Sequence, residues 1–199
     1  MVLQNIAVFL ITTLFSLYIG AVLIRFLLAY ARADFHNPLS QFLVKVTNPL
    51  LVPLRRFIPA LGKVDTASLV LAFLLKLLGI LLLTVVMGQG FNPGYLLLAA
   101  MVDLLRTLIW IYIIAMIVQA VISWVGSAYG NPVVPLLYSL TAPILLPLRK
   151  IVPTIGAVDL SPLVAIVLLQ PATNRAVLLL SAQVNSSLAT AVAKNLFRP

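Results

Sequence analysis

Four long apolar stretches constrain this chain more than any other feature of its sequence. An α-helix needs about 20 residues to cross the hydrocarbon core of a bilayer, and each stretch is long enough. Since 63% of the residues are hydrophobic and only 9% are charged, a soluble fold cannot bury the apolar surface. The sequence therefore predicts an all-α integral membrane protein with four transmembrane helices, at about 3–30, 66–87, 95–124 and 160–182.

The chain also contains an internal duplication. Residues 37–72 align with residues 131–166 at a constant offset of 94, and 15 of the 36 positions are identical. We therefore predict two tandem repeats, 1–94 and 95–199, with two helices each. An even number of spans per repeat gives both copies the same orientation, which predicts a pseudo-twofold axis along the membrane normal.

The best-matched part of each repeat is the loop between its two spans. This repeated loop motif contains prolines, glycine, asparagine and aspartate, whose conformational and charge properties chance apolar bias would not align. In the first loop, 31–65, its residues are Asn37, Pro38, Pro49, Pro53, Pro59, Gly62 and Asp65. In the second loop, 125–159, they are Asn131, Pro132, Pro143, Pro147, Pro153, Gly156 and Asp159.

Both loops are basic, and this charge predicts the topology. By the positive-inside rule we place the two loops in the cytoplasm and both termini on the opposite side of the membrane. The net charge of +9 indicates contact with anionic lipid headgroups and not with nucleic acid. Two pairs of adjacent cations, Arg55–Arg56 and Arg149–Lys150, are candidates for binding headgroup phosphates or guarding a pore mouth, although ordinary membrane anchoring explains them more simply.

Within each loop, Asn-Pro predicts the start of a short amphipathic helix, because Asn caps a helix and Pro suits its first turn. The apolar spacing of Leu39, Phe42, Leu43 and Val46 recurs in the second copy. Three prolines in the eleven residues that follow argue against a long regular helix and predict an interfacial or re-entrant element. Asp65 and Asp159 precede spans and are expected to cap them, with cation binding or proton transfer as the alternative.

Several polar residues lie inside the predicted spans. Lys76 is near the middle of the second span, where an unpaired cation is costly, and its expected counter-ion is Asp103 unless Asp103 pairs locally with Arg106. Equivalent positions of the repeats could meet across the axis and line a polar path; alternatively, Arg25 snorkels and the glutamines bond neighbouring helices. The fourth span is either broken or tilted. The complete candidate set is Arg25, Lys76, Asp103, Gln119, Gln170, Asn174 and Arg175.

Catalysis is not expected. The chain has a single histidine, His36, and has neither cysteine nor glutamate, and no serine has a base at useful spacing. No cluster of metal ligands and no phosphate-binding glycine loop is present in the sequence. We therefore expect no catalytic residue, no metal and no cofactor.

The repeated motif, with Asn-Pro, then Pro-x-x-x-Pro-Leu-Arg-[Arg/Lys]-x-x-Pro and Gly-x-x-Asp, resembles that of the YggT family of bacterial membrane proteins, which includes the YlmG proteins. The resemblance covers essentially the whole chain, and the two-copy form is similar to that of Gram-negative bacteria. It implies an inner-membrane protein linked to osmotic or ion homeostasis, to cell division or nucleoid organisation, or to assembly of a photosynthetic cytochrome complex.

Two functions follow as hypotheses. The first is a small transport or ion-homeostasis protein in which an inorganic ion passes along the repeat interface. Four helices make a thin wall, so this hypothesis includes a homo-oligomer. The second is a scaffold that does not transport, and whose basic cytoplasmic loops bind lipid headgroups or protein partners during envelope assembly.

Overall fold

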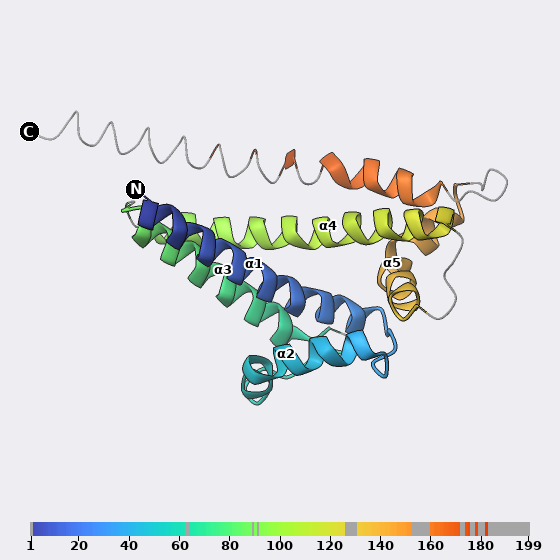
Figure 1. Cartoon of the computed structure of the whole chain (residues 1–199), viewed down its shortest axis with the longest axis horizontal. Helices are drawn as coiled ribbons and strands as arrows, with labels where there is room; N and C mark the ends of the chain where they lie inside the picture. Colours follow the sequence, from blue (N-terminus) through green and yellow to red (C-terminus); the bar gives the residue numbers. More distant parts are fainter. Residues whose placement is uncertain are drawn as a thin grey trace, which may run out of the picture.

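The computed structural model describes residues 2–62, 64–88, 90, 92–125, 131–152, 160–171, 174, 175, 178 and 182. The described chain is helical, apart from one isolated bridge between Leu61 and Val64. Its helices are α1 (Val2–Tyr30), α2 (Pro38–Arg55), α3 (Thr66–Val86), α4 (Pro93–Val125), α5 (Val133–Arg149) and a further helix over Ser161–Pro171 (Figure 1).

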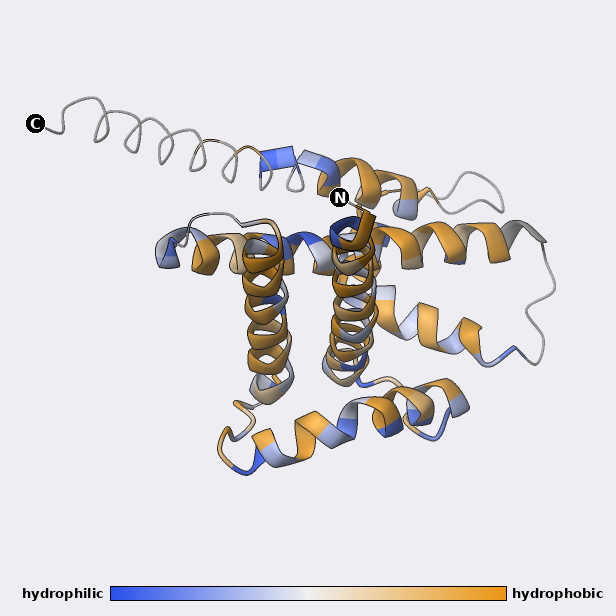
Figure 2. Cartoon of the chain, turned by 60° about the vertical axis from the view of Figure 1, so that its left-hand side comes forward, coloured by the Kyte–Doolittle hydropathy of each residue, from blue (hydrophilic) through white to orange (hydrophobic). Residues whose placement is uncertain are grey.

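Three of these helices are long and apolar enough to cross a membrane: Val2–Tyr30, Thr66–Val86 and Pro93–Ile122. They coincide with the first three predicted spans, and their ribbons are almost entirely hydrophobic in Figure 2. The predicted fourth span, 160–182, is helical over Ser161–Pro171, and most of its remaining residues lie outside the described part of the chain. The fourth crossing therefore stays a prediction.

The helices α1 and α3 pack side by side. Ile19, Val22 and Leu23 of α1 are buried against Ala67 and Leu71 of α3. Farther along the pair, a Cβ added at Gly79 would lie 3.2 Å from the ring of Phe15, so this glycine permits the close approach of the two helices. Figure 1 shows α1 and α3 close to α4 near the N-terminus and diverging from it toward the end where α2 and α5 lie.

The loop helices are longer than predicted, because they continue into the proline-rich segments. Pro49 and Pro53 lie inside α2, and Pro143 and Pro147 lie inside α5. Each pair is four residues apart, so the missing N–H groups fall on one side of the helix and the helix bends there without ending. Figure 1 shows the first turns of α2 from the side and its last turns end-on.

Candidate functional site

Arg25 connects α1 to the bend of α2. Its side chain is buried, at 5% exposed, and its Nη1 donates hydrogen bonds to Thr47 Oγ1 at 2.5 Å and Asn48 Oδ1 at 2.9 Å. The same nitrogen lies 3.4 Å from the carbonyl oxygen of Val44. The guanidinium of Arg25 is therefore bound by polar groups of α2, which folds back against α1.

The second repeat forms the equivalent contact with different chemistry. Thr141 Oγ1 donates a hydrogen bond to Gln119 Oε1 at 2.5 Å, and both residues lie 94 positions after Thr47 and Arg25. Gln119 is also buried. Arg25 and Gln119 thus each bind the loop helix of their own repeat, so the expected meeting of the two across the repeat interface does not occur.

Asp65 connects the end of α2 to the start of α3. Its Oδ2 accepts hydrogen bonds from the guanidinium of Arg55 and from Ser68 Oγ, the latter at 2.6 Å. Its Oδ1 lies 3.4 Å from the backbone nitrogen of Ser68, which confirms the predicted cap. Burial acts to raise the pKa of Asp65, but the hydrogen bonds from Arg55 and Ser68 and the charge of Arg55 outweigh it, so the pKa lies below its usual range.

This ion pair changes the interpretation of the paired cations. Arg55 is bound to a carboxylate of its own chain, and both Arg55 and its neighbour Arg56 are exposed. In the second repeat Arg149 and Lys150 are exposed at the end of α5. The remaining members of the second motif, Pro153, Gly156 and Asp159, lie outside the described residues.

The asparagine and glycine of the first motif have defined conformational roles. Asn37 Oδ1 accepts a hydrogen bond from the backbone nitrogen of Leu39 at 3.0 Å, and Asn131 Oδ1 does the same for Val133 at 3.0 Å. Gly62 has φ +63°, which favours glycine, in the turn that joins Leu61 to Val64. Asn37 and Gly62 therefore shape the loop, which explains why they recur in both copies.

An ion pair joins α3 and α4 inside the spans. Lys76 Nζ lies 2.7 Å from Asp103 Oδ2, and the two side chains are 16% and 36% exposed. The sequence predicted this counter-ion, and the local alternative of Asp103 with Arg106 is not formed. A cavity of about 170 Å³ beside the pair is also lined by the hydroxyl-bearing residues Thr12 and Ser16 of α1. Three helices thus surround a polar site at the middle of the membrane-length segments.

The rest of the predicted polar set lies on the last described segment. Gln170 is exposed at the end of the helix Ser161–Pro171, and Asn174 and Arg175 are exposed beyond it. The predicted break or tilt of this span concerns residues 172 and 173, which lie outside the described part of the chain. These side chains therefore stay sequence-based candidates.

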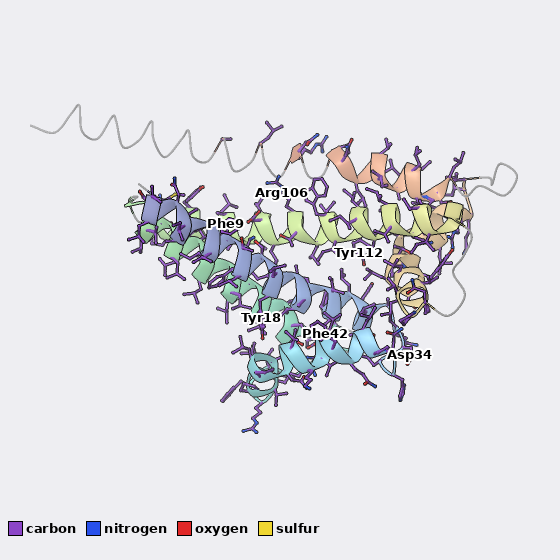
Figure 3. All side chains as sticks on the ribbon, viewed as in Figure 1. Phe9, Tyr18, Asp34, Phe42, Arg106 and Tyr112 are labelled. Atoms are coloured by element: carbon purple, nitrogen blue, oxygen red, sulfur yellow. The ribbon has the colours of Figure 1, made fainter. Side chains whose placement is uncertain are left out.

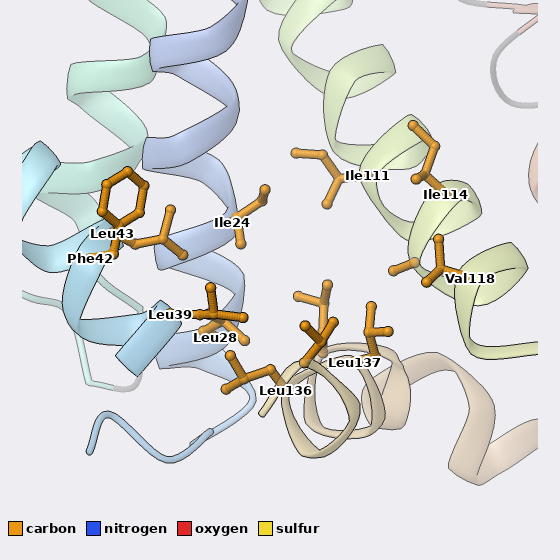
Figure 4. Close-up of a pocket in the computed structure, with 13 residues that line it drawn as sticks. Ile24, Leu28, Leu39, Phe42, Leu43, Ile111, Ile114, Val118, Leu136 and Leu137 are labelled. Atoms are coloured by element: carbon orange, nitrogen blue, oxygen red, sulfur yellow. The ribbon is translucent and has the colours of Figure 1, made fainter. Parts of the chain in front are cut away.

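A second cavity separates the two repeats, and it is apolar. It has a volume of about 360 Å³ and lies between α1 and α4, with the loop helices α2 and α5 at one end (Figure 4). Its lining includes repeat-equivalent pairs, such as Ile24 with Val118 and Leu43 with Leu137. This groove is thus an apolar part of the interface between the repeats, whereas the pair of Lys76 and Asp103 forms a polar part of it.

One pattern in the sequence is related to this groove, although it does not by itself predict it. The apolar faces of the two predicted amphipathic helices repeat at the offset of 94, and in the structure both faces line one space. A hydrogen bond from Asn37 Nδ2 to the carbonyl oxygen of Pro132 at 2.7 Å ties the start of α2 to the start of α5. Pairing of the two faces depends on this contact between repeats.

The fold and the sites define a helical membrane protein in which one helix–loop helix–helix unit occurs twice. The model of the CCB3/YggT family matches the chain twice, at residues 4–86 and 98–180. The chain therefore belongs to this family. The boundaries predicted at 94 and 95 lie between the two matches.

Several bacterial proteins match this chain over most of their length. An uncharacterized protein of Pseudomonas aeruginosa is 42% identical over 171 residues, which are 84% of this chain and 86% of the relative. A Vibrio alginolyticus protein described by its place in the proC 3' region is 39% identical, covering 84% and 91%. The Escherichia coli K12 protein called uncharacterized protein YggT is 37% identical, covering 83% and 86%. No solved structure matches the chain.

Proposed function

We propose that this protein serves ion homeostasis during osmotic stress by allowing a monovalent cation to cross at the polar site between α1, α3 and α4. The ion pair of Lys76 and Asp103 beside a polar cavity carries this proposal. An ionisable pair at this depth is costly to insert and typically marks an ion pathway. The proposal places the protein in the bacterial inner membrane with the proline-rich loops in the cytoplasm.

The chemistry of the cavity favours a cation. The Asp103 carboxylate and the hydroxyl oxygens of Thr12 and Ser16 are hard oxygen ligands of the kind that bind such ions. In the structure the ammonium of Lys76 is paired with the carboxylate of Asp103. A cation that enters the cavity competes with this ammonium, so movement of Lys76 away from Asp103 opens the site. The cation does not pass through the groove between the repeats, because that groove is lined by apolar side chains.

The test is ion flux into sealed vesicles that contain the purified protein. Potassium, sodium, proton and chloride flux are measured for the wild type, for Lys76→Met, and for the double variant Lys76→Met with Asp103→Asn. Removal of one partner leaves a buried charge and costs about 3 kcal/mol of stability, whereas removal of both charges is close to neutral. We expect the double variant to fold like the wild type and to lose cation flux.

A matched control separates this site from other cations of the chain. Arg106→Gln removes a charge three residues from Asp103 that does not belong to the pair, and we expect it to retain flux. Absence of flux for every ion in the wild type overturns the proposal, and so does unchanged flux in a folded double variant. Loss of flux together with loss of folding in the double variant assigns the pair to structure alone.

A second candidate is a scaffold that does not transport and that binds anionic headgroups or protein partners through its loops. The exposed cations Lys45, Arg56 and Lys150 on the loop helices favour it. Wild-type vesicles without flux, together with binding of the protein to partners that is lost when these cations are neutralised, support the scaffold. Neither candidate includes a catalytic step or a cofactor.

A further inference from the structure

The apolar groove between the repeats is the starting point of this inference. Its walls come from α1 and α4, and its end is formed by the apolar faces of the amphipathic helices α2 and α5. Phe42 on its edge is 62% exposed, and Val118 on the opposite wall is 38% exposed. The groove therefore opens sideways at the depth of the apolar spans, where the surrounding medium is hydrocarbon.

The size of the groove restricts what fits in it. The groove is small, with a volume of about 360 Å³, and the side chains that line it are aliphatic and aromatic. A helix, about 10 Å across with its side chains, needs a wider groove than a single acyl chain does. A single acyl chain is thinner than a helix and makes only apolar contacts, which matches the aliphatic and aromatic lining.

A cation follows the groove-lining end of α1 in the chain, in the turn that terminates this helix. Leu28 lines the groove, and its carbonyl oxygen accepts a hydrogen bond from the backbone nitrogen of Ala33 at 2.9 Å. The backbone nitrogen of Arg32 donates to the carbonyl oxygen of Ala29 at 3.1 Å. These two bonds form a Schellman motif, in which Arg32 occupies the left-handed position with φ +53°.

An arginine is an unusual choice for this position. Glycine adopts a left-handed conformation without strain, and the equivalent residue of the second repeat is Gly126. A strained non-glycine residue next to a binding surface indicates that its side chain is required there. The strained residue Arg32 belongs to the first loop, 31–65, which contains more cations than the second loop, 125–159.

The charge of Arg32 is available for an external anion. The chain has four acidic residues. Asp34 contacts His36, while Asp65 and Asp103 pair with Arg55 and Lys76. Among the described residues no acid pairs with Arg32, and its side chain is exposed. The fourth acid, Asp159, lies outside the described residues.

We propose that the groove binds one acyl chain of an anionic phospholipid, whose phosphate is bound by the guanidinium of Arg32. The acyl chain lies between α1 and α4 and contacts both repeats, so the lipid fills the space where the two repeats diverge. The guanidinium donates hydrogen bonds to the phosphate oxygens in a geometry that matches this group well. This site is independent of the ion pair on α3 and α4.

The test counts lipids that stay bound to the purified full-length protein in native mass spectrometry. Phosphatidylglycerol and phosphatidylcholine with identical acyl chains are titrated separately. Val118→Trp fills the groove from a half-exposed wall position, and Leu14→Trp adds the same side chain to an exposed α1 position outside it. We expect the wild type to retain one phosphatidylglycerol, Val118→Trp to lower its affinity for either lipid about tenfold, and Leu14→Trp to have no effect.

Arg32→Gly tests the headgroup contact without a risk to folding, because glycine suits the left-handed position. We expect about a tenfold loss of affinity for phosphatidylglycerol alone, together with a higher thermal unfolding midpoint. The matched control Lys150→Gln retains the preference. The proposal is overturned if Val118→Trp retains lipid like the wild type, if Arg32→Gly keeps the preference, if inorganic phosphate displaces the lipid, or if Val118→Trp changes the oligomer mass instead of the lipid count.

Discussion

At the scale of single residues, Asp65 combines roles that would otherwise need several side chains. It caps α3 through the backbone and hydroxyl of Ser68 and binds the guanidinium of Arg55 at the end of α2. The negative charge also lies at the positive end of the α3 dipole. A single aspartate thus fixes how α2 joins the span that follows, which explains its place in the repeated motif.

This pairing predicts a specific acid sensitivity. Because the pKa of Asp65 is lowered in the folded state, its contribution to stability is complete above the unfolded-state pKa of about 3.9. The contribution is lost as the pH falls through the lower, folded-state value. We expect the free energy of unfolding in detergent micelles to decrease below about pH 4 in the wild type.

The variant Asp65→Asn provides the comparison. Its unfolding free energy is expected to be lower at neutral pH and to change less between pH 5 and acid than that of the wild type. Asp34→Asn is the control, because hydrogen bonds from the backbone and ring of His36 also lower the pKa of Asp34 but its carboxylate is exposed in a loop. An acid response that is the same in Asp65→Asn as in the wild type contradicts the assignment.

At the scale of helices, the attachment of α2 to α1 depends on one buried cation and a proline-induced bend. The bend brings Thr47 and Asn48 to Arg25, and Tyr18 on α1 adds a hydrogen bond to the carbonyl oxygen of Val46 at 3.3 Å (Figure 3). The second repeat achieves the same attachment with Gln119 and Thr141. A neutral amide is therefore sufficient where the partner is a single hydroxyl.

The natural difference between the repeats supplies a matched pair of variants. We expect Arg25→Ala to lower the free energy of unfolding by about 3 kcal/mol, because it leaves buried polar groups of α2 without a donor. Arg25→Gln, which installs the residue used by the second repeat, is expected to cost about 1 kcal/mol. Denaturant titration followed by tryptophan fluorescence measures both. Equal costs for the two variants contradict the role assigned to the guanidinium.

At the scale of the whole molecule, the two repeats reuse one packing arrangement. Leu51 of α2 and Leu145 of α5 are fully buried at equivalent positions, each in a cluster with the helix before it and the helix after it. The repeats differ in the charge of two equivalent positions, since Arg25 and Lys76 of the first repeat correspond to Gln119 and Gln170 of the second. The proposed ion site therefore resides in the helices of the first repeat with α4.

The orientation of the molecule is directly testable because the sequence has no cysteine. Single cysteines at Lys45, on the loop helix α2, and at Gly90, between α3 and α4, report the two sides of the membrane. We expect a membrane-impermeant maleimide to label Gly90→Cys in intact cells, and to label Lys45→Cys only after permeabilisation. The unmodified chain gives the background. Reversed labelling contradicts the cytoplasmic assignment of the loops.

The sequence by itself determined the features that depend on local chemistry. Apolar length defined the three described spans, the offset of 94 defined the repeat, and cap chemistry identified Asn37 and Asp65. The counter-ion of Lys76 was also predicted, since so few acids are available to neutralise a cation within the spans. These features need no knowledge of how distant segments pack.

Only the tertiary structure showed which partners the other buried polar groups have and where the apolar faces of the loop helices meet. Pro49 and Pro53 lower the cost of bending α2 but do not specify the direction, so the sequence did not reveal that the bend delivers Thr47 to Arg25. The groove arises because α1 and α4 diverge while the starts of α2 and α5 are tied together. Such arrangements depend on contacts between residues 22 to 95 positions apart, which local patterns do not encode.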